Sequence, residues 1–202
     1  VENIKYDEKE MPSGTFRYDA KSPLSSIFGP NELRAYKVVS SFLLRLKRTE
    51  YTLSNSKFNL RSAQLLAFEM QAFIRLVGDY FNFHIIKKSY ESFNKSFSEK
   101  EISFDELLKS HTYHVNFIAR GCWATNSGQK CKLSFYKLLD TIDLLHNKLN
   151  DLKADKKQNK IVDEIRNRFH KSLIELHGNL LSHKVSGIEL APPLARMFKN
   201  VF

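Results

Sequence analysis

Proline is confined to the two ends of this sequence, and this distribution limits the fold more than any other feature. Three of the five prolines lie between Met11 and Pro30, and the other two form the pair Pro192-Pro193. Glycine is also scarce, with seven in 202 residues. Because proline breaks helices and glycine weakens them, the long stretch between the two ends can form extended helices. The sequence predicts an all-α protein.

The apolar periodicity predicts a bundle of about five long helices after an extended lead-in segment. We divide the chain into this lead-in, residues 1–30, and a helical domain, residues 31–202. Asn31 is a suitable N-cap, and Ser103 and Glu106 have the spacing of a capping box. The expected helices span residues 31–54, 60–97, 103 to 121–127, 131–153 and 161–184, with a short last helix after the proline pair. Because the chain begins at Val1 rather than methionine, we expect it to be a fragment.

The charge balance favours an acidic partner. The net charge is +10 with a pI near 9.5, which suits nucleic acid, an anionic membrane or an acidic protein surface. No apolar run approaches the roughly 20 residues that cross a bilayer, so we expect no membrane-spanning segment. Two cysteines, Cys122 and Cys131, do not make a disulfide framework and favour a reducing compartment.

The first predicted helix carries two opposed stripes at about 100° per residue. Leu43 and Leu46 fall with Tyr36 and Val39 on an apolar stripe, which we expect to face the core. This stripe is flanked by Ala35, Val38 and Phe42. The opposite stripe consists of Arg34, Lys37, Ser41, Arg45 and Arg48. No carboxylate of this helix interleaves the cations, which indicates an anionic partner, and a merely solvated face is the alternative.

The stretch "PLSSIFGPNELRAYKVVSSFLLRLKRTEYTL" resembles the start of the C-terminal GRIP domain of the γ-tubulin complex proteins. The matching residues are Pro23, Leu24, Phe28, Tyr36, Phe42, Leu43, Lys47, Arg48, Glu50, Tyr51 and Leu53. The resemblance continues in register at Glu69, Met70, Phe73, Ile74, Tyr80, Phe83, Asp105, His111, Cys122, Arg196, Asn200 and Phe202. It touches almost the whole chain and is dense at residues 23–53 and 69–123.

Some positions depart from the family pattern. Ser22 stands where a tryptophan is usual, Gly78-Asp79 replaces a glutamine-aromatic pair, and Phe198 replaces an acidic residue. Such departures are typical of a diverged member, for example a fungal one. The stretch from Glu69 to Ile74 slightly favours the type-3 over the type-2 subunit.

The resemblance implies a subunit that binds γ-tubulin through this helical domain. Other subunits of the complex would pair laterally through an N-terminal half that this chain lacks, so that ordered γ-tubulins template microtubule assembly. The implied location is the cytoplasm and cytoskeleton, at a microtubule-organising centre or spindle pole body. The candidate γ-tubulin contacts are Arg34, Lys37, Arg45, Lys47 and Arg48. The family-motif positions with a structural role are Pro23, Leu24, Tyr36, Phe42, Leu43, Tyr51, Met70, Phe73, Tyr80 and His111.

Other functional classes find less support in the sequence. A basic helical nucleic-acid-binding module is the main alternative, although its aromatics are not interleaved with the cations as stacking platforms would be. A structural subunit that has lost γ-tubulin contact is a third reading. No phosphate loop, nucleophile elbow or metalloprotease pair occurs, so we expect no enzyme and no cofactor.

Two groups of side chains have a structural and a functional interpretation. His111, His114 and Cys122 share one predicted helix, but about three turns separate the first from the last, so we expect no metal site. Trp123 is expected in the core. The aromatic series is expected there too, with a partner-binding stripe as its alternative; it comprises Tyr80, Phe81, Phe83, Tyr90, Phe93 and Phe97.

Overall fold

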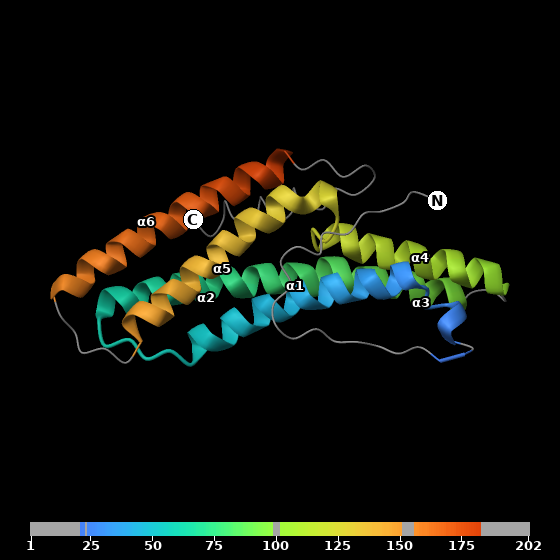
Figure 1. Cartoon of the computed structure of the whole chain (residues 1–202), viewed down its shortest axis with the longest axis horizontal. Helices are drawn as coiled ribbons and strands as arrows, with labels where there is room; N and C mark the ends of the chain where they lie inside the picture. Colours follow the sequence, from blue (N-terminus) through green and yellow to red (C-terminus); the bar gives the residue numbers. More distant parts are fainter. Residues whose placement is uncertain (1–20, 23, 99–101, 151–155, 183–202) are drawn as a thin grey trace. The chain divides into compact units, whose positions relative to one another are not determined.

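The computed structural model describes residues 21–22, 24–98, 102–150 and 156–182, and it confirms the all-α prediction. The α-helices are α1 (Pro30–Ser54), α2 (Arg61–Asp79), α3 (Lys88–Ser98), α4 (Phe104–Gly121), α5 (Gln129–Leu149) and α6 (Lys156–Ser182) (Figure 1). The shorter elements are the 3₁₀ turns η1 (Leu24–Ser26) and η3 (Asn126–Gly128) and the π-helix η2 (Tyr80–Lys87). Since α2, η2 and α3 follow one another without a break, the helical runs number five among the described residues.

Most predicted boundaries agree with the observed ones within a few residues. α1 begins at Pro30, one residue before the predicted Asn31 cap. The capping box of α4 is present: the Glu106 N–H donates to Ser103 Oγ at 3.3 Å, and the Ser103 N–H donates to Glu106 Oε2 at 2.9 Å. α6 begins at Lys156, five residues before the prediction. The expected last helix, Phe198 and most of the lead-in lie outside the described residues, so the division at residue 30 stays a prediction.

Contacts divide the chain into two compact units. Unit 1 comprises residues 1–44 and 79–129, and unit 2 comprises residues 45–78 and 130–202. Unit 1 therefore contains the first part of α1 with η2, α3 and α4. Unit 2 contains the second part of α1 with α2, α5 and α6.

An aromatic cluster forms the core of unit 1. The Phe81 ring lies 5.1 Å from the Phe42 ring and 5.0 Å from the Trp123 ring, both in edge-to-face geometry, a favourable arrangement for buried aromatic pairs. Trp123 is buried, as predicted, but its φ of 53° lies in the left-handed region. It ends α4 in a Schellman motif, in which Ala124 N–H donates to Ala119 O at 2.8 Å. Tight packing of the indole offsets the backbone strain.

Unit 2 has a separate core around Phe73 of α2. Its ring lies 5.7 Å from the Phe169 ring of α6 and 6.2 Å from the Phe135 ring of α5. Figure 1 shows α5 and α6 as neighbours, and Lys137 Nζ pairs with Glu175 Oε1 at 2.7 Å across them. The buried aromatics of three helices thus meet in one interior.

The buried stripe of α1 differs from the predicted one. Leu43, expected in the core, is half-exposed, whereas its neighbour Phe42 is fully buried. Ser41, expected on the cationic stripe, is buried and donates from Oγ to the Lys37 carbonyl at 2.8 Å. The core positions are Ala35, Val38, Val39, Phe42, Leu46, Thr49 and Leu53. This stripe is centred about one residue away from the predicted one, because the bulky phenyl ring rather than the leucine points inward.

The π-helix changes which aromatics are buried after residue 80. Tyr80 and Phe81 are buried as predicted, but Phe83 and Tyr90 are exposed, and Phe93 is half-buried. A π-turn closes between residues i and i+5 and holds one residue more than an α-turn. Phe81, Ile85 and Ser89 are buried at intervals of four residues. The expectation of a wholly buried aromatic series is wrong for Phe83 and Tyr90. The side chain of Phe97 lies outside the described ones.

Candidate functional site

The five predicted cations all lie on α1 but belong to different units. Arg34 and Lys37 are exposed in unit 1, and Arg34 is itself engaged in an interaction. Lys47 and Arg48 are exposed in unit 2, where Arg45 is only partly exposed. The helix therefore does present cations to solvent, and their availability differs from one residue to the next.

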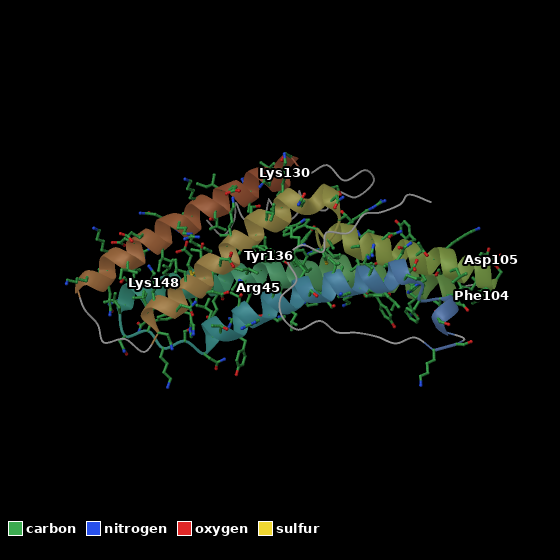
Figure 2. The ribbon with its side chains drawn as sticks, in the orientation of Figure 1. Arg45, Phe104, Asp105, Lys130, Tyr136 and Lys148 are labelled. Atoms are coloured by element: carbon green, nitrogen blue, oxygen red, sulfur yellow. The ribbon has the colours of Figure 1, made fainter. Side chains whose placement is uncertain are left out.

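Arg45, labelled in Figure 2, is held by two carboxylates of α5. Its Nη2 lies 2.6 Å from Asp140 Oδ1 and 2.9 Å from Asp143 Oδ2. Burial raises the pKa of Asp143, while the Arg45 charge acts in the opposite direction. Arg45 thus connects α1 to α5, and the two carboxylates neutralise part of its charge. The helix sequence alone gives no sign of this, since both partners lie almost one hundred residues away.

Lys47 and Arg48 retain more of their charge for a partner. Lys47 Nζ pairs with Glu50 Oε2 at 2.8 Å, one turn along the same helix, and most of its side chain stays in water. Exposed pairs of this kind contribute little and are easily exchanged. Arg48 is exposed, and its positive charge also favours the ionised form of Asp143. These two residues are the accessible cations of α1 in unit 2.

The family-motif residues fall into buried and exposed groups. Phe42, Met70, Phe73, Tyr80 and His111 are buried, and Tyr36 and Leu43 are half-exposed. Tyr51 is largely exposed, although a structural role was expected for it. Pro23 lies outside the described residues, and Leu24 belongs to η1. Because it is exposed, this motif tyrosine is a candidate contact residue.

His111 joins α1 to α4 inside unit 1. Its Nε2 lies 3.1 Å from the Tyr36 hydroxyl, and the Phe28 ring packs edge-on at 5.1 Å. Its Nδ1 is buried and has no hydrogen-bond partner among the described residues. Burial, followed by the neighbouring charge of His114, lowers the pKa of His111, with Glu32 opposing the shift. A neutral imidazole fits this aromatic setting.

His114, one turn further, packs against α3. Its Nδ1 lies 2.8 Å from Ser89 Oγ, and its ring stacks on Phe93 at 5.0 Å. Burial lowers the pKa of His114, with the Ser89 hydrogen bond opposing the shift. Beside it, α3 and α4 enclose a groove of about 280 Å³ lined by Ser89, Ser92, Phe93, Ser96, Tyr113 and Phe117 among others. Both imidazoles are therefore occupied in packing.

The described residues give no support for a metal site or a reactive thiol. Burial raises the pKa of Cys122 to about 12, so that thiol stays protonated at neutral pH. Within the described ranges, no group of three His, Cys, Asp or Glu side chains is placed to hold a metal ion. Nor does any described helix have the length and apolar character needed to cross a membrane.

Comparison with known proteins gives one family match. Residues 13–196 match the family model described as gamma tubulin complex component C-terminal. The match covers most of the chain, including every α-helix of Figure 1.

Two curated relatives are consistent with this match. Spindle pole body component 98 of Dictyostelium discoideum is 27% identical over 67% of this chain and 19% of its own length. Gamma-tubulin complex component 3 of Arabidopsis thaliana is 25% identical over 77% of this chain and 24% of its own length. The chain therefore spans about a fifth to a quarter of the relatives that it matches.

Proposed function

Because the chain belongs to the gamma tubulin complex component C-terminal family, we propose that it is the γ-tubulin-binding part of a γ-tubulin complex subunit. The family match across residues 13–196 is the observation that carries this proposal. In this proposal, the domain binds one γ-tubulin, and lateral pairing of whole subunits places several γ-tubulins side by side. Such ordering lowers the entropic cost of starting a microtubule. The role is structural rather than enzymatic.

The charge of the domain supports the same proposal. Tubulins are acidic, whereas this chain carries a net charge of +10. Opposite charges raise the encounter rate and fix orientation more than they add affinity. The exposed residues Lys37, Lys47 and Arg48 are suited to this task. Arg45 is the weakest of the candidates, because Asp140 and Asp143 already hold it.

The other proposed partners and the location follow from the names of the relatives. One relative is a spindle pole body component and the other a γ-tubulin complex component. We place this chain at a microtubule-organising centre, in a complex with further subunits of its family. Those subunits would attach outside the part of the protein that this chain represents.

A direct binding experiment tests the proposal. The full chain and purified γ-tubulin, mixed at micromolar concentration in low salt, should co-elute in size-exclusion chromatography. Two separate peaks would contradict γ-tubulin binding by this domain. A parallel titration with duplex and single-stranded nucleic acid, showing a steep dependence on salt without γ-tubulin binding, would favour the nucleic-acid module instead.

The cations are tested by charge reversal. Lys37→Glu with Arg48→Glu should slow γ-tubulin association at low salt and leave the melting temperature almost unchanged, because exposed charges contribute little to folding. Lys130→Glu with Lys148→Glu is the charge-matched control, since both lysines are exposed on α5 (Figure 2). If both double variants slow association equally, the effect depends on net charge alone, and the cations of α1 do not contact γ-tubulin.

A further inference from the structure

The outer face of α2 carries large apolar side chains between two arginines. Arg61, Leu65, Phe68, Ala72 and Arg75 follow one another at helical spacing, and 59% of Leu65 and 72% of Phe68 are exposed. The opposite face of α2 is buried through Ala63, Leu66, Met70, Phe73, Ile74 and Val77. A helix with apolar residues on both faces usually has both faces covered. Among the described residues, α2 therefore lacks a cover for one of them.

On one side, this face continues onto α1. Gln71 Nε2 donates to Ser54 Oγ at 2.9 Å, which fixes the end of α1 beside α2. Tyr51 lies one turn before Ser54 and is 72% exposed. Lys47 lies one further turn back. Along α1, Tyr51 thus lies between Ser54, which contacts α2, and the accessible cations, and all of these residues belong to unit 2.

On the other side, the face continues onto α6. Glu69 Oε1 lies 2.5 Å from His170 Nε2, which fixes the register between α2 and α6. Ile174 follows His170 by one turn on the same side of α6 and is 74% exposed. Tyr51, Leu65, Phe68 and Ile174 together are called the outer apolar patch. Large exposed apolar side chains on three neighbouring helices are typical of a protein-binding site.

The charges around the patch are cationic. Arg61 and Arg75 lie at the two ends of the α2 stripe, and neither makes an ion pair with any described residue. Two neighbouring carboxylates are already engaged, Glu50 by Lys47 and Glu69 by His170. The surface is therefore complementary to a protein with an apolar centre and acidic edges. It also contains the tyrosine, phenylalanine and arginine that are common among interface residues.

Resting on the proposed function, we infer that the outer apolar patch is the apolar centre of the γ-tubulin contact. Exposed cations such as Arg48 accelerate encounter but do not by themselves give a long-lived complex. A long lifetime needs a few large side chains that become fully desolvated. Unit 2 presents these side chains directly beside its accessible cations. The two groups then have separate roles: the cations raise the association rate, and the outer apolar patch lowers the dissociation rate.

The test separates the two roles kinetically in the full chain. Leu65→Ser with Phe68→Ser should raise the dissociation rate from γ-tubulin about tenfold or more, at any salt concentration, and leave the association rate nearly unchanged. The melting temperature should hold, since both side chains are mostly in water. Tyr90→Ser removes an equally exposed aromatic of α3 in unit 1 and should leave both rates unchanged.

The outcomes distinguish this inference from the function on which it rests. If the wild-type chain does not bind γ-tubulin, the proposed function falls and the inference with it. If the wild type binds and the Leu65/Phe68 double variant dissociates at the same rate, the inference alone is wrong. A wild-type dimer in sedimentation that the double variant abolishes, with γ-tubulin kinetics unchanged, would assign the patch to a second copy of the chain and overturn the inference.

Discussion

At the scale of single residues, the buried histidines give unit 1 a dependence on pH. Burial lowers the pKa of both His111 and His114 below the ordinary value of 6.5. The unfolded chain therefore binds more protons than the folded one as pH falls through that value. Their contribution to stability is full above this pH and is lost progressively below it.

We expect the melting temperature to fall between pH 7.5 and pH 5, and to fall less in His111→Gln with His114→Gln. Circular dichroism melts across this range measure the effect. His84→Gln is the control, because it makes the same substitution at an exposed position of unit 1. A double variant that keeps the full pH slope would show that other groups titrate. The charged and titratable neighbours of His111, besides His114, are Glu32 and Tyr36.

We expect Arg45 to contribute to the fold more than to binding. Replacing it with glutamine should lower the free energy of unfolding by about 1 kcal/mol, because the pair with Asp140 and Asp143 is partly exposed to water. Arg45→Glu should cost more, since it places three carboxylates together. Urea denaturation measures both changes. Arg48→Gln should be near neutral, because Arg48 has no ion pair among the described residues. An equally neutral Arg45→Glu would contradict this role.

Leu43 and Leu46 separate the predicted from the observed face of α1. Leu46 is fully buried and Leu43 is half-exposed. Leu46→Ala should cost about 2 to 5 kcal/mol through lost burial and the cavity it leaves, and Leu43→Ala less than about 1.5 kcal/mol. Equal losses in denaturant titrations would restore the leucine stripe that the sequence predicted.

At the scale of elements, the glycines of α4 and α6 are in opposite situations. A Cβ on Gly121 would lie 2.5 Å from Cγ2 of Ile85, whereas a Cβ on Gly178 meets nothing within 4 Å. Gly121→Ala should destabilise the protein by about 1 to 3 kcal/mol through overpacking. Gly178→Ala should stabilise it by about 0.5 to 1 kcal/mol, because alanine suits an exposed helix interior.

Thermal melts of the two glycine variants provide the measurement. In the background of Ile85→Ala, the cost of Gly121→Ala should shrink, since the clashing side chain is gone. A cost that persists there would place its origin in the α4 backbone rather than in the contact with Ile85.

Helix positions were predictable from the sequence, and helix faces only in part. Pro30 and the Ser103–Glu106 capping box mark helix starts locally, so α1 and α4 lie where they were expected. No local signal marks the π-helix, because its backbone geometry depends on what packs around it. Phe83 and Tyr90 were therefore assigned to the wrong side.

The cations of the candidate site were predictable from the sequence, but their ion pairs and the exposed apolar side chains beside them were not. The sequence indicates the cations of α1, yet the pair of Arg45 with Asp140 joins residues far apart in the chain. The sequence analysis did not predict the outer apolar patch. An amphipathic helix has apolar residues on its buried face, and only the structure shows that the buried face of α2 lies opposite Leu65 and Phe68. Such features depend on which helices become neighbours.

At the scale of the whole molecule, the two units need not respond equally to a perturbation. The histidine pair, Gly121 and Trp123 all belong to unit 1, and Arg45 with the outer apolar patch belongs to unit 2. Each unit has its own aromatic interior, around Phe81 in one and Phe73 in the other. Variants in one unit can therefore be read against variants in the other.

The buried Trp123 has a spectroscopic consequence, because it is the one tryptophan in the sequence. Its intrinsic fluorescence reports on the interior of unit 1, whereas far-ultraviolet circular dichroism sums the helices of both units. Solvent entering around the indole should shift its emission to longer wavelength. Emission and ellipticity that change at one temperature would mean a single cooperative transition. A red shift that precedes the loss of ellipticity would mean that unit 1 opens while the helices of unit 2 persist, with no dye or label attached.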